Sequence, residues 1–248
     1  MAEVWIGTSG WIYKHWVGIF YPPNLPAGEH LPYYATHFPT VEVNYSFYRL
    51  PERSAFEAWR QQTPVGFLFA VKGSRYLTHM KKLKDPQEAL ARLMERATAL
   101  EEKLGPILFQ FPHTWAANLS RLDEFLGALE AYAPRRFAFE FRHESWLCPP
   151  VYALLERAGA ALCAPVSPRL PRHLGLTAPW TYIRMHEGRA GIGFGGAELQ
   201  EWAGHIGRFE RQGADVYVYF NNDPQGYALR DADALRRLLG RDAAASRR

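Results

Sequence analysis

The stretch Phe-Ala-Phe-Glu-Phe-Arg at residues 137–142 decides the fold. Its three phenylalanines alternate with Ala138, Glu140 and Arg142. Successive side chains of a strand point to opposite faces, so one face is apolar throughout and the other becomes charged toward its carboxyl end. Seven further strand-like runs surround it along the chain. They are Val4–Thr8, Thr40–Ser46, Gly66–Lys72, Ile107–Phe111, Ala161–Val166, Thr181–His186 and Val216–Asn221.

Helical patterns lie between most of these runs. One helix is predicted to begin with Asp85 as its N-cap and Pro86 in its first turn, and to run to about Leu104, where Gly105 and Pro106 stop it. Ser120 and Asp123 are expected to open the next helix, and Asp231 the last one. Another helix is expected over Ala197–Gln212. Eight strand–helix alternations predict an α/β fold, a single TIM-like (β/α)8 barrel with a closed parallel sheet and outer helices. Residues 1–240 would form it, and 241–248 would be a disordered tail.

The composition agrees with one such domain. The chain has 248 residues, close to the usual length of this barrel, and 48% hydrophobic residues exclude wholesale disorder. Two cysteines, Cys148 and Cys163, cannot form a disulfide scaffold and are expected to be free thiols in a reducing compartment. Neither a signal peptide nor an apolar run of about 18 residues is visible, so we expect a cytoplasmic protein without membrane contact.

The inward face of the predicted barrel carries the candidate site. Polar groups follow one another at the carboxyl ends of the strands, where active sites of this fold lie. They are Glu42, Asn44, Lys72, Gln110, Glu140, Arg142, Arg184, His186, Asn221 and Asp223. Acids and bases could pair there merely to hold the barrel together. So many polar groups at one end nevertheless cost more desolvation than a scaffold needs, which favours a functional pocket.

The same segments resemble the YecE-like family of uncharacterised TIM barrels, domain of unknown function seventy-two. The matching motifs are Ile6–Trp11 with Tyr13, Val41–Asn44, Lys72 with Thr78-His79, Gln110–Pro112, Glu140–His143 with Trp146, Tyr182–His186, and Tyr219–Asp223. The resemblance covers nearly the whole chain and implies the TIM-barrel fold, but it implies no established activity. Three departures stand out: Val166-Ser167-Pro168 lacks the family's acid, Glu187 interrupts a His-Gly pair, and Phe194 replaces a tyrosine.

Charge divides unevenly between the two ends of the predicted barrel. The loops expected at the carboxyl ends of the strands carry a formal +8, which leaves −4 on the rest because the whole chain is +4. Lys72, Arg75, Lys81, Lys82 and Lys84 form the densest part. This asymmetry predicts an anionic small-molecule or nucleic-acid ligand at that end. No protein partner can be named.

The first hypothesis is a cytosolic enzyme for a phosphorylated substrate, acting by phosphodiester hydrolysis or by proton transfer on a sugar phosphate. Lys72, Arg142 and Arg184 would neutralise the anion, with Glu140 or Glu42 as base and His186 or His79 as proton donor. The other ligand-binding candidates are Asn44, Gln110, His143, Trp146, Asn221, Asp223, Trp11 and Tyr13.

Two other functions stay open. Basic groups mixed with aromatic side chains could instead form a non-catalytic module that binds single-stranded nucleic acid or a nucleotide. Glu42 and Glu140 could also serve a two-carboxylate glycoside hydrolase, although the surrounding cations suit anions better than neutral sugars.

Bound groups are not expected. No cofactor is predicted, and a divalent metal held by His79, His143 and His186 is not favoured because no metal-binding spacing is present. The glycine-rich segment 188–196 is interpreted as a lid or hairpin rather than as a phosphate loop.

Overall fold

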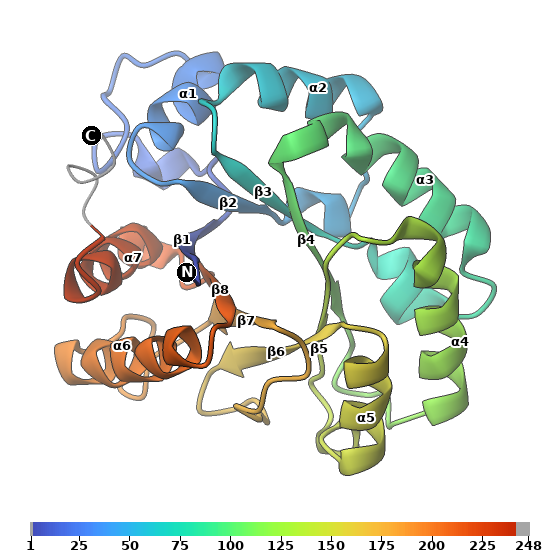
Figure 1. The fold of residues 1–248 in the computed structure, drawn as a ribbon. Helices are drawn as coiled ribbons and strands as arrows, with labels where there is room; N and C mark the ends of the chain where they lie inside the picture. Colours follow the sequence, from blue (N-terminus) through green and yellow to red (C-terminus); the bar gives the residue numbers. More distant parts are fainter. Residues whose placement is uncertain (1, 242–248) are drawn as a thin grey trace.

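Eight parallel strands close into a barrel in the computed structural model, which describes residues 2–241 (Figure 1). Each strand pairs with its neighbours in chain order, and β1 closes the sheet by pairing with β8. The strands are β1 (Val4–Ser9), β2 (Thr40–Val43), β3 (Leu68–Lys72), β4 (Leu104–Gln110), β5 (Phe137–Glu140), β6 (Ala161–Val166), β7 (Trp180–Met185) and β8 (Asp215–Phe220). The predicted TIM-like barrel is confirmed.

Helices surround the sheet, as Figure 1 shows. They are α1 (His30–Ala35), α2 (Arg53–Gln62), α3 (Gln87–Ala97), α4 (Leu119–Leu129), α5 (Pro149–Arg157), α6 (Gly196–Arg211) and α7 (Tyr227–Leu238). Seven α-helices are thus found within residues 2–241, because the connection from β6 to β7 passes through an irregular segment, 167–179, instead of a helix.

The two faces of the strands differ as the alternation predicts. Phe109 and Phe139 point outward and pack under the helices, in the large apolar core between the sheet and the helical layer. A second, smaller apolar cluster fills the barrel interior with Ala70, Tyr182 and Tyr219 among its members. The interior is therefore a packed core, and polar groups can gather only at its ends.

Two predicted helix boundaries are wrong. Asp85 does not cap α3, since Pro86 occupies the N-cap and Asp85 has a positive φ of 42°. The helix ends at Ala97, and a 3-10 segment, Thr98–Lys103, leads into β4. Gly105 and Pro106 therefore lie inside the strand, where a Cβ on Gly105 would come within 3.2 Å of the carbonyl oxygen of Phe69.

The last helix also begins earlier than predicted. It starts at Tyr227 after Gly226, whose φ of 72° suits glycine, and not at Asp231. The Asp231 carboxylate is buried and accepts hydrogen bonds from the Phe194 amide at 3.0 Å and from Asn222 Nδ2 at 2.6 Å. Apart from Arg241, the predicted tail lies outside the described residues. Within those residues, every helix is too short or too polar to cross a membrane.

Candidate active site

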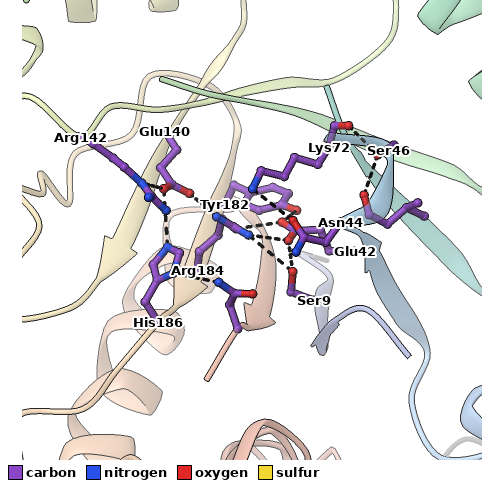
Figure 2. Close-up of polar contacts among 12 residues, drawn as sticks. Ser9, Glu42, Asn44, Ser46, Lys72, Glu140, Arg142, Tyr182, Arg184 and His186 are labelled. Carbon is purple, nitrogen blue, oxygen red and sulfur yellow. Dashed lines mark hydrogen bonds and ion pairs between the residues drawn. The ribbon is translucent and has the colours of Figure 1, made fainter. Parts of the chain in front are cut away.

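Polar side chains converge at the carboxyl ends of the strands inside the barrel (Figure 2). Glu42 of β2, Glu140 of β5 and Arg184 of β7 form the centre of this group, and all three side chains are fully buried. The strands bring them together because inward-facing residues at one level of a closed barrel share the same narrow interior. The sequence pattern predicts these three side chains on the inward face at the carboxyl ends of the strands, which we call the barrel mouth. The structure places them there.

The Arg184 guanidinium links the two carboxylates. Its Nε and Nη2 donate to the two oxygens of Glu42 at 3.0 and 2.7 Å, and Nη1 donates to Glu140 Oε2 at 2.7 Å. Bidentate charge-assisted hydrogen bonds of this kind are strong and fix the orientation of both partners. We call Glu42, Arg184 and Glu140 the buried triad.

Both carboxylates of the buried triad are held in the ionised form. Burial is the largest single effect and acts to raise the pKa of Glu42 and of Glu140. The charge of Arg184, together with the neighbouring cations and hydrogen-bond donors, outweighs burial and lowers both pKa values. Glu42 also accepts hydrogen bonds from Ser9 Oγ and, at 2.7 Å, from the Tyr182 hydroxyl. Each Glu42 oxygen thus has two donors, which leaves it poorly suited to accept a proton.

Arg142 and His186 lie against the outer side of Glu140 (Figure 2). Arg142 Nε donates to Glu140 Oε1 at 2.7 Å, and the Arg142 side chain keeps 27% of its surface exposed. It is therefore the arginine of this cluster that solvent and ligands can reach. Its neighbour Arg184, in contrast, is enclosed on all sides.

His186 is a neutral side chain with one orphan nitrogen. Burial lowers its pKa, and Asn221 Nδ2 lies 3.1 Å from Nδ1. With the Asn221 amide donating, the ring proton resides on Nε2. That nitrogen is buried and has no hydrogen-bond partner, because the nearest carboxylate oxygen, Glu140 Oε1, is 3.6 Å away. A polar atom left in this state is what a substrate could satisfy.

Lys72, the last residue of β3, projects its amine into the same region (Figure 2). Its Nζ donates to Asn44 Oδ1 at 3.1 Å and lies 4.1 Å from the centre of the Phe47 ring. Burial, reinforced by the charge of Arg184, lowers its pKa to about 7. A substantial share of this amine is therefore uncharged at neutral pH.

Three further predicted residues, His79, Gln110 and His143, have different contacts around this centre. His79 packs edge-on against the Phe47 ring, and burial together with the charge of Lys72 lowers its pKa to about 4, so it is neutral. Gln110 is buried beside Glu140, with which it is in register. His143 accepts a hydrogen bond from the Ser145 amide and thereby caps the turn that follows.

Tyr13 and Asp223 form a separate contact set above β1 and β8. The Tyr13 hydroxyl donates to the Ser9 carbonyl at 2.5 Å, and its ring lies 4.9 Å from that of Trp16. Asp223 accepts from Trp16 Nε1 at 2.7 Å and lies 3.0 Å from His15 Nε2. These contacts fix the β1 and β8 loops beside the mouth.

The two predicted tryptophans face away from the buried triad. Trp146 is fully buried, donates to the Trp115 carbonyl at 2.7 Å and stacks on Phe141, on the strand face opposite to Glu140. Trp11 is 6% exposed and packs against Trp59 and Phe69. Both rings belong to the core between sheet and helices.

Sequence reasoning missed Ser9 and Tyr182 as partners of Glu42. Tyr182 shares the inward face of β7 with Arg184, so the same alternation that places the arginine could have indicated the tyrosine. Ser9 carries no comparable signal, because a serine at a strand end has many ordinary uses.

The glycine-rich segment begins with a short hairpin turn, held by an isolated antiparallel bridge between Gly188 and Gly191, so the hairpin interpretation holds for residues 188–191. Its Arg189 amide donates to Glu198 Oε2 at 3.1 Å, and its Phe194 amide is bound by the Asp231 carboxylate. Two amides of the segment are thus already occupied by carboxylates.

A cavity of about 470 Å³ opens beside the hairpin, at the carboxyl ends of β6 and β7. Ser167 Oγ donates to Glu187 Oε1 at 2.5 Å in its wall, where Arg172 and Arg189 also lie. Within residues 2–241, no group of three or more histidine, cysteine or acidic side chains is arranged to hold a metal ion. Cys148 and Cys163 are free thiols.

Comparison with known proteins connects this geometry to one family. The family model described as "Protein of unknown function DUF72" matches residues 5–248. Among curated relatives, the UPF0759 protein YunF of Bacillus subtilis (strain 168) is 26% identical, over 95% of this chain and 94% of its own length. The UPF0759 protein YecE of Escherichia coli (strain K12) is 29% identical over 56% of this chain and 48% of its own length.

Solved structures agree with the fold. A DUF72 family protein from Thermotoga maritima MSB8 is 29% identical with a TM-score of 0.83, and the match covers 96% of this chain and 99% of that one. A DUF72 family protein from Enterococcus faecalis V583 has a TM-score of 0.80 at 18% identity, with 96% of each chain covered.

Proposed function

Because the chain belongs to the DUF72 family, whose description names no activity, we propose its function from the site itself. The protein would be an enzyme that binds a small phosphorylated substrate at the barrel mouth and transfers a proton on that substrate. The observation that carries the proposal is the pairing of an accessible arginine with uncharged proton-transfer groups. Arg142 is partly exposed and oriented by Glu140. Lys72 is partly uncharged near neutral pH, and the lowered pKa of His186 keeps its ring neutral there.

The buried triad would act as the support of this site. It holds Arg142 through Glu140, and its two carboxylates balance two guanidinium groups, so an incoming phosphate meets a cation whose position is already fixed. Preorganised charge of this kind is the largest contribution to catalysis in many enzymes. Arg142 would bind the phosphate, and Lys72 or His186 would move the proton.

The same geometry argues against a two-carboxylate glycosidase. That mechanism requires one protonated carboxyl group with a raised pKa and a second carboxylate that is free to attack or to activate water. Arg184 instead lowers the pKa of both Glu42 and Glu140 and occupies oxygens of each. Neither acid is therefore available for the role that it would need.

One test measures binding and turnover separately. Inorganic phosphate would be titrated by calorimetry into the wild type, into Arg142→Gln and into the control Arg157→Gln, which removes an exposed arginine that pairs with Asp123 outside the barrel. We expect Arg142→Gln to weaken binding at least about tenfold, a loss of about 1.4 kcal/mol, and the control to leave it unchanged.

Turnover would be followed by proton NMR as deuterium uptake from D2O into a panel of aldose and ketose phosphates. We expect exchange on at least one compound and its loss in His186→Gln or Lys72→Met. Phosphate binding that is equally tight in the wild type and in Arg142→Gln would contradict the proposal. So would hydrolysis of a phosphodiester by a protein that exchanges deuterium into none of the sugar phosphates.

A second candidate function is binding of single-stranded nucleic acid, favoured by one observation. Tyr45, Tyr48 and Tyr76 are 59%, 65% and 44% exposed on the loops that follow β2 and β3, close in sequence to Arg49 and Arg75. Exposed aromatic rings beside cations suit base stacking along a phosphate backbone. Salt-dependent binding of an oligonucleotide that Tyr48→Ala weakens and Arg142→Gln does not would support it.

A further inference from the structure

Lys72 differs from a lysine placed only to provide positive charge. Its Nζ has one hydrogen-bond acceptor, Asn44 Oδ1, and the Phe47 ring as its other neighbour. No carboxylate oxygen in the described part of the chain lies within ion-pair distance of it, although Glu42 and Glu140 belong to the same cluster. Those acids are already committed to Arg184 and Arg142, so the amine has no counter-ion.

The other buried lysine provides the contrast. Lys103 lies at the opposite end of the sheet, just before β4, and is likewise 5% exposed. Its Nζ donates to the carbonyls of Arg60 and Thr63 at 2.6 and 2.5 Å and to Thr63 Oγ1 at 3.1 Å. Three oxygens satisfy the three protons of an ammonium group. Lys72 lacks such a set of oxygen acceptors. A buried lysine without them is more easily deprotonated, and an uncharged amine can react as a nucleophile.

We infer that Lys72 is a nucleophile that forms an imine with the carbonyl group of a phosphorylated aldehyde or ketone. Its nitrogen lone pair would attack the carbonyl carbon, and the carbonyl oxygen would take up a proton to give a carbinolamine. Loss of that oxygen as water would leave the C=N bond between Nζ and the substrate. Atoms balance as amine plus carbonyl giving imine plus water, and no oxidant or reductant is needed.

The arrangement of the cluster fits a substrate of this class. Arg142, the more exposed cation, would hold the phosphate at the outer side, and Lys72 would meet the carbonyl group deeper in the mouth. A protonated imine withdraws electrons from the adjacent carbon, so it makes the proton there easier to remove. This inference rests on the proposed function, since it names the group through which a proton of the substrate becomes acidic.

A matched pair of small aldehydes tests the inference on the whole protein. Glycolaldehyde phosphate and glycolaldehyde differ only by the phosphate, and cyanoborohydride reduces an imine to a stable secondary amine. The folded protein would be treated near pH 7, digested, and searched by peptide mass spectrometry for the modified lysine. Lys81, half-buried on the loop after β3, is the internal reference.

The expected preference is large. An amine of pKa about 7 is half uncharged at pH 7, whereas a lysine of ordinary pKa, about 10.4, is uncharged in roughly one molecule in 2,500. Lower basicity and burial reduce this advantage, so we expect Lys72 to be labelled at least about tenfold faster than Lys81. Lys72→Arg should abolish this label, and Lys81→Arg should not affect it.

The outcomes separate the inference from the proposed function. Preferential labelling of Lys72 by both aldehydes alike supports the imine and contradicts the phosphate site at Arg142. A preference for the phosphorylated aldehyde that Arg142→Gln removes supports both. Labelling of Lys72 no faster than of Lys81 overturns the imine, whatever the result of the phosphate titration. Thermal melting of each variant would confirm that the labelled protein is folded.

Discussion

Replacement of Arg184 by methionine is the sharpest test of the buried triad. The substitution keeps a long side chain but removes three hydrogen bonds to Glu42 and Glu140, both fully buried. Glu140 keeps its ion pair with Arg142, but Glu42 loses the cation that is hydrogen-bonded to it, and removing one partner of a buried ion pair costs about 3–5 kcal/mol. At about 2–4 °C per kcal/mol for a chain of this size, the melting temperature should fall by roughly 6–20 °C.

The buried triad also predicts how the free energy of unfolding changes with pH. In the wild type the pKa values of Glu42 and Glu140 are lowered, so their stabilisation is present above the unfolded value of about 4.3 and is lost as the pH falls below it. Without Arg184, burial should raise the pKa of Glu42 above 4.3, whereas Glu140 still pairs with Arg142. The folded variant then binds protons more readily than the unfolded chain, and its stability should rise as the pH falls from 7 toward 5.

Urea denaturation near pH 7 and near pH 5 measures both effects without adding salt. Glu42 and Glu140 should add little to the change in the wild-type free energy of unfolding between these values, so the deficit of Arg184→Met relative to the wild type should shrink at the lower pH. Adding Glu42→Gln to Arg184→Met should also recover part of it, since position 42 then no longer carries a buried charge without a bonded cation. A loss below about 1 kcal/mol, or parallel pH dependence in both proteins, would refute the account.

Three further predictions address other parts of the molecule. Burial lowers the pKa of Lys72 to about 7, so the folded protein gains stability as the pH rises from about 7 to about 10.4. Lys72→Met should therefore have a higher melting temperature than the wild type near pH 6, and the difference should shrink as the pH rises from about 7 to about 10.4. Gly7→Ala should destabilise by at least about 1–3 kcal/mol in urea, since its Cβ would lie 2.0 Å from a carbonyl oxygen, whereas Gly204→Ala on an exposed helix position should stabilise by about 0.5–1 kcal/mol. Burial raises the pKa of Cys163, so a thiol reagent should modify at most Cys148 in the folded protein and both cysteines after unfolding; fast modification of Cys163 in native conditions would contradict its position inside the barrel.

The fold was predictable because barrel strands have a simple period. The alternation in 137–142 predicts which side chains face inward, and β5 places Ala138 and Glu140 on that face. Helix ends were less predictable, because a capping residue competes with tertiary partners. Asp231 has the right type to begin a helix, yet its carboxylate binds the Phe194 amide and Asn222 from within α7.

In the candidate site, too, one part follows from the sequence pattern and another does not. Convergence of Glu42, Glu140 and Arg184 follows from topology, since inward residues at the carboxyl ends of closed strands must meet. The orientation of loop aromatics does not follow from it. Trp146 follows β5 closely in the sequence, but its ring packs on Phe141 on the outer face, and only the three-dimensional path of the loop decides this.

The state of each titratable group is the part that sequence reasoning could least supply. A glutamate beside an arginine in the sequence suggests an ionised acid, but the choice of base depends on which charges are already compensated. Here Glu42 and Glu140 balance Arg184 and Arg142, so the four charges sum to zero and Lys72 is the surplus cation of the buried group. Burial without a counter-ion favours the uncharged amine, which is the state that imine formation needs. The substrate phosphate therefore has to stay with Arg142, because an anion in contact with Nζ would restore its proton by the same electrostatics. An inorganic anion that contacts Lys72 directly should, by linkage, bind more tightly as the pH falls toward the pKa of Lys72, about 7.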